Sequence, residues 1–162
     1  MKVKDVMMRT AASCTPETNV GAAVEILWNR NCGILPVVDS RQKVIAVVTD
    51  RDLCIALGTR NCLPGEITVG QVASGKLFTC KSEDQVRSAL ATMGETKVRR
   101  LPVVNAEGRL EGILSMDDIV VHSESKVSGT ASELSHDDVV GTLKKLYRRD
   151  LPQMVQHKAA GA

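Results

Sequence analysis

Leu35-Pro36-Val37-Val38 recurs unchanged as Leu101-Pro102-Val103-Val104 within a chain of 162 residues. The recurrence is part of a longer match, because residues 3–56 lie over residues 69–122 at a constant shift of 66, without a gap, and 11 of the 54 pairs are identical. A unit of this size cannot bury both faces of a sheet alone, so a second copy must cover it. The sequence therefore predicts two stacked copies of one unit, related by a pseudo-twofold axis.

Each copy predicts the same order of elements: helix, strand, helix, strand, strand, helix. The longer helices carry apolar residues at positions i, i+3, i+4 and i+7, which form one buried face. These residues are Val20, Ala23, Val24 and Leu27 in the first copy and Val86, Ala89, Leu90 and Met93 in the second. Two short apolar strands follow in each copy, joined by a polar turn. Ser82-Glu83-Asp84-Gln85 has the form of a capping box, which predicts the start of the second copy's helix.

These elements predict an α/β (α+β) fold in which each unit is a small sheet flanked by helices. We expect a first unit over residues 1–57, a connecting loop over 58–67 and a second unit over 68–122. Residues 123–134 read as a linker, and 135–162 as a C-terminal helix that starts near Ser135, followed by a tail. The apolar stripe of that helix predicts that it docks on the body of the protein or on a second subunit.

Composition excludes several classes of protein. Lys and Arg total 21 against 19 Asp and Glu, so the charge of +2 gives no general reason to expect a nucleic-acid or membrane partner. Aromatic residues make up 2% of the chain, too few for the stacking platforms of single-stranded nucleic-acid binders. Neither a membrane span nor a signal peptide is apparent, which predicts a cytoplasmic protein. Five cysteines without a C-x-x-C pair predict buried hydrophobic residues and no metal site.

A hydroxyl residue stands at the end of the last strand in each copy, with an aspartate three positions later. The pairs are Thr49 with Asp52 and Ser115 with Asp118. One interpretation is a capping box that satisfies free N–H groups at the start of a helix. The other is a ligand site, since a helix N-terminus attracts phosphate and a nearby carboxylate can accept hydrogen bonds from ribose hydroxyls. Both interpretations fit the spacing.

The repeat order, the L-P-V-V strands and the two segments 46–52 and 112–118 closely resemble tandem cystathionine-β-synthase (CBS) domains, also called a Bateman module. The resemblance covers residues 3–122, and the layout is similar to small stand-alone bacterial members of the hypoxic-response type. It implies two clefts for an adenine-type nucleotide. Carried over, the first cleft uses Thr49 and Asp52 with Ile34 and Pro36 near the adenine. The second uses Ser115 and Asp118 with Val98 and Pro102.

Three arginines extend this expected site. Arg99 and Arg100 stand just ahead of Leu101-Pro102, where the first copy has Gly33 and Ile34. Two guanidinium groups at the mouth of a cleft can clamp phosphate oxygens bidentately. We assign this role to the pair, for whichever cleft it serves, with Arg51 as a weaker third phosphate ligand.

The expected function is regulation, with AMP, ADP or ATP as the regulatory ligand and an unidentified protein as the regulated partner. No required cofactor is expected. An enzyme is not expected, because the sequence has no P-loop and no Ser-His-Asp set, and its histidines are His122, His136 and His157. The alternative is an interaction or scaffolding module with vestigial clefts. By the same resemblance we expect a homodimer through apolar helix faces, with Trp28 at the edge. Those faces would be formed by Val20, Val24, Leu27, Val86, Leu90 and Met93.

Overall fold

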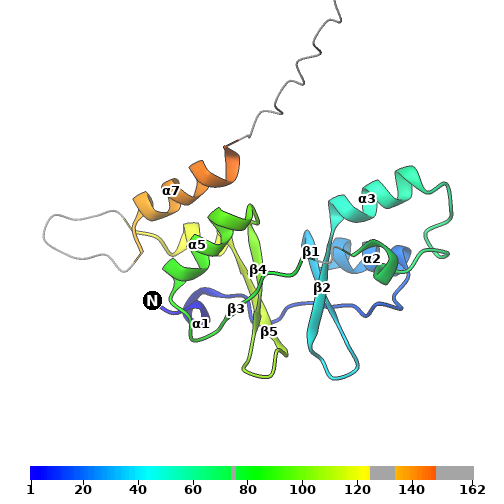
Figure 1. Ribbon diagram of the computed structural model, residues 1–162, viewed down its shortest axis with the longest axis horizontal. Coiled ribbons are helices and arrows are strands. Elements are labelled where there is room, and N and C mark those ends of the chain that lie inside the picture. Colours follow the sequence, from blue (N-terminus) through cyan, green and yellow to red (C-terminus); the bar gives the residue numbers. More distant parts are fainter. Residues whose placement is uncertain (74–75, 125–133, 149–162) are drawn as a thin grey trace, which may run out of the picture.

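The computed structural model describes residues 1–73, 76–124 and 134–148. Within these ranges the helices are α1 (Val3–Val6), α2 (Val20–Asn29), α3 (Asp50–Thr59), α4 (Val69–Val72), α5 (Val86–Thr96), α6 (Met116–Val121) and α7 (His136–Tyr147). The strands are β1 (Ile34–Val38), β2 (Val44–Thr49), β3 (Cys80–Lys81), β4 (Arg100–Val104) and β5 (Leu110–Ser115). The two repeats stand side by side, each a small sheet packed with helices, and this mixed helix and strand architecture is the one that the sequence predicts (Figure 1).

Each repeat is built around one antiparallel hairpin. Strand β1 pairs with β2 so that Ile34 lies opposite Thr49, and β4 pairs with β5 so that Arg100 lies opposite Ser115. Strand β3 adds a short parallel partner to β4, where Cys80 lies opposite Val103. The brief strand expected in the first repeat is reduced to a single parallel bridge between Cys14 and Val37.

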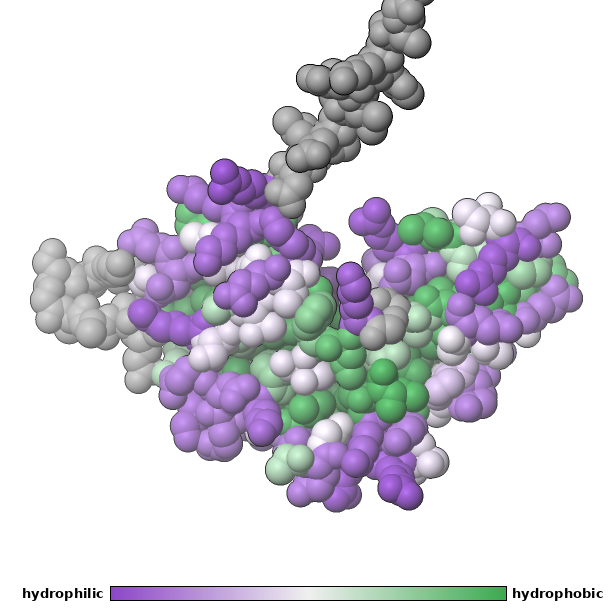
Figure 2. Space-filling model, in the orientation of Figure 1, coloured by the Kyte–Doolittle hydropathy of each residue, from purple (hydrophilic) through white to green (hydrophobic). Residues whose placement is uncertain are grey.

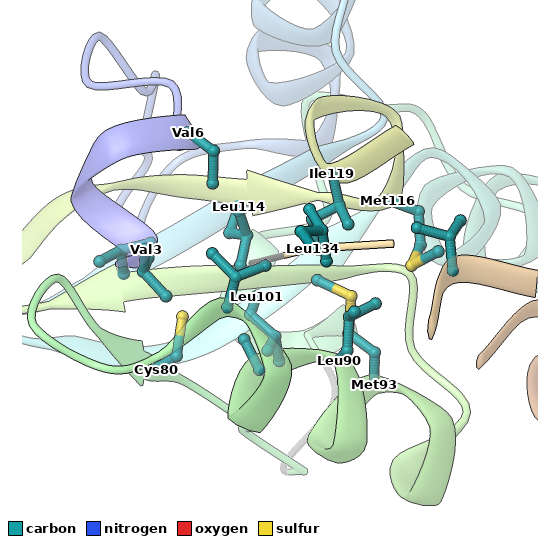
Figure 3. Packing of buried hydrophobic residues seen from close by; sticks show 14 residues of the cluster. Val3, Val6, Cys80, Leu90, Met93, Leu101, Leu114, Met116, Ile119 and Leu134 are labelled. Carbon is teal, nitrogen blue, oxygen red and sulfur yellow. The ribbon is translucent and has the colours of Figure 1, made fainter. Parts of the chain in front are cut away.

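The first helix of each repeat packs on the other repeat. Val3 and Val6 of α1 belong to the core of the second repeat, with Leu101 and Leu114 (Figure 3). Val69 of α4 belongs in the same way to the core of the first repeat. Equivalent hydrogen bonds hold the two helices, from Val3 N to Asp84 O at 2.9 Å and from Val69 N to Thr18 O at 2.8 Å. The repeats therefore interlock about the pseudo-twofold axis.

The two hairpins also meet at their turns. Val44 N donates to Gly108 O at 3.0 Å, and at the equivalent place Leu110 N donates to Gln42 O at 3.3 Å. These bonds lie at the end of each hairpin opposite Thr49 and Ser115. They fix the relative position of the repeats, and hence of the hydroxyl residues at the other end of the strands.

The capping box predicted over Ser82-Glu83-Asp84-Gln85 is wrong. Helix α5 begins at Val86, and its N-cap Gln85 makes no side-chain capping bond. The Val86 amide instead donates to Met1 O at 3.2 Å, while the Asp84 carboxylate accepts from Lys81 N at 2.8 Å. A segment distant in sequence supplies the cap, which the local pattern cannot reveal.

Helix α7 confirms the expected C-terminal helix and lies against α5 (Figure 1). Ser135 is its N-cap, and Leu134 and Val139 join the core of the second repeat. The predicted tail and most of the predicted linker, at 149–162 and 125–133, lie outside the described residues.

The helix faces expected to form a dimer are mostly buried within the chain, so that part of the prediction is wrong. A core this small uses them for its own packing, and α7 covers the second repeat. The buried residues are Val20, Leu27, Val86, Leu90 and Met93. Val24 remains 40% exposed and Trp28 84% exposed on α2.

Trp28 and Gly94 occupy equivalent positions in the two repeats, yet their surroundings differ. A Cβ atom on Gly94 would lie 3.1 Å from Lys145 Cδ, so the absence of a side chain lets α7 approach α5 closely. The indole of Trp28 projects from α2 instead. Helix α7 therefore covers α5 at Gly94, whereas the equivalent surface of α2 at Trp28 is open.

Candidate functional site

A cleft of about 290 Å³, here called the inter-repeat cleft, opens beside the N-terminus of α3. The first repeat contributes the start of β1 and the junction of β2 with α3, and the second contributes the segment before β3 and the turn between α5 and β4. Its lining residues are Gly33, Ile34, Val47, Thr49, Asp50, Arg51, Lys76, Phe78, Lys97, Val98, Arg99, Arg100 and Pro102.

Positive charge is concentrated around this cleft. Five of its lining residues are cationic, and Asp50 is the one carboxylate among those that line it. The whole chain carries only +2, so the cleft is far more basic than the protein on average. Arg100 has a carboxylate neighbour, with its Nη2 atom 3.8 Å from Asp117 Oδ2, but the aspartate is 85% exposed and such pairs are weak. The lining therefore favours an anion with several negative charges.

The remaining wall of the cleft is apolar. Ile34 and Val47 come from the hairpin of the first repeat, and Phe78, Val98 and Pro102 come from the second. Phe78 is the sole phenylalanine in the sequence. An apolar wall next to a cationic rim suits a ligand with a flat, weakly polar part and a strongly anionic part.

Thr49 joins this cleft to the ten-residue helix α3 as its N-cap. Its Oγ1 atom donates to Asp52 Oδ2 at 2.7 Å and accepts from Asp52 N at 3.2 Å, while Thr49 N donates to the same carboxylate oxygen at 2.9 Å. The hydroxyl is thus engaged within the capping box. The positive end of α3 nevertheless points into a basic cleft, an arrangement that favours phosphate.

The second repeat differs at the same place. Ser115 and Asp118 form an identical box at the start of α6, but α6 has only six residues. The first amide of α6, Met116 N, donates to Arg99 O at 2.9 Å. In the described structure no matching hydrogen bond joins the Asp50 amide to Gly33. The start of α6 is therefore tied to the neighbouring turn more closely than the start of α3.

The same box occurs a third time, outside the repeat. Ser135 and Asp138 cap α7 with bonds of 2.7 Å between their side chains and 3.0 Å from Ser135 N to Asp138 Oδ2. The capping interpretation is thus satisfied at all three sites. The box alone does not indicate a ligand, and the case for a site rests on the cleft.

The cleft gathers residues that the sequence assigned to two separate clefts. Seven of the predicted site residues line it together: Ile34, Thr49, Arg51, Val98, Arg99, Arg100 and Pro102. Pro36, Asp52, Ser115 and Asp118 do not line it. Pro36 is buried in β1 opposite Val47, and both aspartates have an oxygen engaged in capping. The roles of all eleven residues in ligand binding stay predictions.

Sequence reasoning missed six lining residues: Gly33, Val47, Asp50, Lys76, Phe78 and Lys97. Lys97 stands in the run Lys97-Val98-Arg99-Arg100, so its charge was a usable signal. Lys76 and Phe78 had none, because the approach of their segment to the first repeat is set by tertiary structure.

A second, larger cavity of about 890 Å³ lies between α2 and α3, here called the helix groove. Val24, Leu27, Trp28, Leu53 and Leu57 supply its apolar lining. Figure 2 shows hydrophobic residues exposed on the surface of the first repeat, to which α2 and α3 belong.

The helix groove shares three residues with the inter-repeat cleft: Gly33, Asp50 and Arg100. A Cβ atom on Gly33 would lie 3.3 Å from Asp50 Oδ2 and 3.4 Å from Arg100 Nη1. The absence of a side chain at Gly33 lets these two charged groups close the wall between the cavities.

None of the five cysteines is among the residues that line the inter-repeat cleft. Cys14 and Cys80 are buried, and burial raises the pKa of the Cys14 thiol to about 11 and that of Cys80 to about 12. Cys32 and Cys54 line the helix groove. Across residues 1–73, 76–124 and 134–148, no three His, Cys, Asp or Glu side chains gather as a metal site would require. None of the helices in these ranges is both long and apolar enough to span a membrane.

Comparison with known proteins identifies the repeat. The family model for the CBS domain matches residues 3–59 and again residues 69–125. The CBS domain-containing protein YhcV of Bacillus subtilis is 30% identical over 140 residues, which cover 85% of this chain and 97% of that protein. Hypoxic response protein 1 of Mycobacterium tuberculosis is 28% identical over 117 residues, which cover 72% of this chain and 81% of that protein.

Solved structures share this architecture. A crystal structure of Hypoxic Response Protein I with two coordinated zinc ions has a TM-score of 0.70 and 26% identity, over 76% of this chain and all (100%) of that chain. A crystal structure of CBSX2 in complex with AMP has a TM-score of 0.64 and 28% identity, over 74% of this chain and 93% of that one. CBSX2 comes from Arabidopsis thaliana.

Proposed function

Because this chain belongs to the CBS domain family, we propose that it is a non-catalytic regulatory protein that binds an adenine nucleotide in the inter-repeat cleft. The ligand is of the AMP, ADP or ATP type and acts as a regulator, with no cofactor required. The observation that carries the proposal is the composition of the cleft: five cationic residues and the N-terminus of α3 beside an apolar wall. The complex of CBSX2 with AMP supports this class of ligand.

The chemistry of the lining suggests how the nucleotide lies. The adenine packs on the apolar wall, against Ile34, Val98 and Pro102. The phosphates face Arg99 and Arg100, whose guanidinium groups can each donate two parallel hydrogen bonds. Asp50 is the lining carboxylate within reach of the sugar hydroxyls, while Asp52 acts on the site through the cap of Thr49.

Regulation by this protein works through assembly with other chains. We expect a homodimer in which the open helix groove of one copy meets that of the other, and a regulated partner protein beyond it. The groove and the cleft share the wall formed by Gly33, Asp50 and Arg100, so a ligand in the cleft touches residues of the dimer surface. The cytoplasmic location predicted from the sequence stays a prediction.

Calorimetric titration with AMP, ADP, ATP, NAD, S-adenosylmethionine and adenosine tests the proposal. Replacing Arg99 and Arg100 together by Ala should weaken ADP and ATP by about tenfold or more, since a hydrogen bond to a charged group contributes ~1.5–3 kcal/mol. Adenosine should lose much less. The matched control is Arg41→Ala with Arg109→Ala, which removes the same charge from the hairpin turns at the far end of the strands.

Two outcomes contradict the proposal in different ways. Equal losses for adenosine and ATP would mean that the arginines hold the fold rather than phosphate. No binding of any of these compounds would favour the alternative function, an interaction or scaffolding module with vestigial clefts. Wherever ATP binds the wild type, the Arg41 and Arg109 control should bind it with the same affinity.

A further inference from the structure

Lys97 makes contacts on two sides of the molecule. It is one of the residues that line the inter-repeat cleft, next to Arg99 and Arg100. Its Nζ atom donates to Lys145 O at 2.7 Å and to Arg148 O at 3.2 Å, at the end of α7. Carbonyl groups in the last turn of a helix lack intrahelical partners, and a cation there also complements the helix dipole. Lys97 therefore acts as a side-chain cap for α7 while standing at the rim of a site for anions.

The backbone fixes Lys97 in this position. It is the C-cap of α5 in the left-handed conformation, with φ 61 and ψ 31, and its amide donates to Met93 O. Glycine or asparagine is the usual residue at such a C-cap, so a lysine there bears a conformational cost. The left-handed turn directs the chain from α5 into Val98 and the start of β4. One residue thus joins the end of α5, the cleft and the end of α7.

We propose that phosphate groups in the inter-repeat cleft take the Lys97 ammonium from the carbonyls of α7, so that nucleotide binding loosens the C-terminal turn of α7 from α5. The inference rests on the proposed function, because it needs an anionic ligand in that cleft. It adds a consequence of binding that neither the family match nor the fold supplies, since α7 lies beyond residues 3–59 and 69–125.

The direction of the exchange follows from charge. An ammonium group binds an ionised phosphate more strongly than a neutral carbonyl, because both partners are then charged. Arg99 and Arg100 lie beside Lys97 in the same lining and hold a phosphate close to it. The contacts of Lys97 Nζ with Lys145 and Arg148 are to their main-chain oxygens, which are neutral.

The rest of α7 stays anchored when this turn loosens. At its N-terminal end, Arg87 Nη2 of α5 lies 3.0 Å from Asp138 Oδ2, and Leu134 and Val139 are buried. The C-terminal end of α7 is the end nearer the first repeat (Figure 1). Its departure would uncover the surface around Gly94, where Lys145 now packs. Nucleotide would thereby change which helix surface the second repeat offers to a partner.

Hydrogen exchange of the full-length protein, read by mass spectrometry, tests the coupling. In the wild type, saturating ATP should raise the exchange of amides in the last turn of α7 by about tenfold or more, the effect of losing hydrogen bonds from a charged group. Adenosine, which has no phosphate, should leave that turn unchanged. Lys97→Met keeps the side-chain length without the charge, so its α7 turn should exchange fast before any ligand is added, and ATP should add nothing.

Lys43→Met is the matched control, because Lys43 lies in a hairpin turn at the opposite end of β2 from Thr49. It should behave as the wild type. A lysine ammonium has three donors, so the alternative is that a phosphate adds to the existing contacts without displacing them. Protection of α7 by ATP, or no change while calorimetry records binding, would overturn the coupling and leave the proposed function intact. Absence of ATP binding would defeat the proposed function and the coupling with it, and unchanged α7 exchange in ligand-free Lys97→Met would defeat the coupling alone.

Discussion

At the scale of single residues, the hydroxyl and aspartate pairs have a structural role that is complete without a ligand. Thr49 with Asp52, Ser115 with Asp118 and Ser135 with Asp138 make the same set of hydrogen bonds. What distinguishes Thr49 is its surroundings, since it alone of the three lines the inter-repeat cleft. The residue type provides the cap, and the tertiary position provides the opportunity to bind.

Substitution of the aspartates separates capping from binding. Asp52→Ala and Asp118→Ala should each lower the free energy of unfolding by about 0.5–2 kcal/mol, the usual cost of losing a helix cap. Asp52→Ala should also weaken ATP binding by up to about tenfold, because loss of the Thr49 cap loosens the start of α3, which faces the cleft. Denaturant unfolding and calorimetry measure the two effects.

The control for this comparison is Asn19→Ala, which removes the side-chain cap of α2 outside the cleft. It should lower stability and leave ATP affinity unaltered. If ATP affinity is unchanged in Asp52→Ala, in Asp118→Ala and in the double variant, the two aspartates are capping residues only.

The sequence could predict part of this site and not the rest. Thr49 could be predicted because it completes a capping pattern with Asp52. The Arg99-Arg100 pair could be predicted because it replaces Gly33 and Ile34 of the first copy. The sequence does not reveal that Ile34 and Val98, predicted for different clefts, line the same one. Nor does it place Phe78 there, since nothing local to residue 78 encodes its approach to the first repeat.

At the scale of elements, the exchange of first helices explains why the two repeats form one body. Val3 and Val6 of α1 have the same spacing as Val69 and Val72 of α4, so either helix could cover either core by pattern alone. The hairpins are different, because their apolar runs and turns lie close in sequence and were predicted correctly. The pairing of strands within a hairpin can be predicted from the sequence. The choice of α1 and α4 between two equivalent cores cannot.

The segment after α1 depends on Gly112 in β5. Met8 N donates to Ile113 O and Ile113 N donates to Met8 O, both at 2.9 Å, and a Cβ atom on Gly112 would overlap the carbonyl oxygen of Met8. Gly112→Ala should therefore lower the free energy of unfolding by about 1–3 kcal/mol, the cost of overpacking against a backbone that cannot yield easily. Thermal and denaturant unfolding measure this loss.

Gly141 in α7 is the matched control. A Cβ atom there meets nothing within 4 Å, so Gly141→Ala should stabilise the helix by up to about 1 kcal/mol. Equal effects of the two substitutions would contradict the close approach of the N-terminal segment to β5.

At the scale of the whole molecule, the two repeats are similar in fold and different in what they expose. The second repeat has its helices covered by α7, with Gly94 at the contact, while the first leaves the helix groove open beside Trp28. The duplication predicted that both repeats would contribute equivalent apolar helix faces to a dimer, with three of the six proposed residues taken from each repeat. The C-terminal helix breaks that equality, and only its position on α5 could reveal this.

The open groove carries the last prediction, a homodimer formed through the first repeat alone. A twofold interface must be self-complementary, and this surface holds both a projecting indole and, next to it, an apolar cavity of about 890 Å³. Buried tryptophans commonly dominate such interfaces, so Trp28→Ala should cost about 2 kcal/mol or more of association, a rise in the dimer dissociation constant of roughly thirtyfold. Because Trp28 is 84% exposed within one chain, the same substitution should leave the fold of the protomer within about 0.5 kcal/mol of the wild type.

Tyr147→Ala, at the other strongly exposed aromatic residue of the described chain, is the matched control and should remain dimeric, since Tyr147 is 64% exposed on α7 and lies outside the groove. Light scattering after size exclusion, at tens of micromolar, distinguishes the two variants. A monomeric wild type at that concentration would refute the dimer. A Trp28→Ala variant that stays as dimeric as Tyr147→Ala would place the contact elsewhere, and the wall of Gly33, Asp50 and Arg100 would then not connect the nucleotide cleft to the subunit interface.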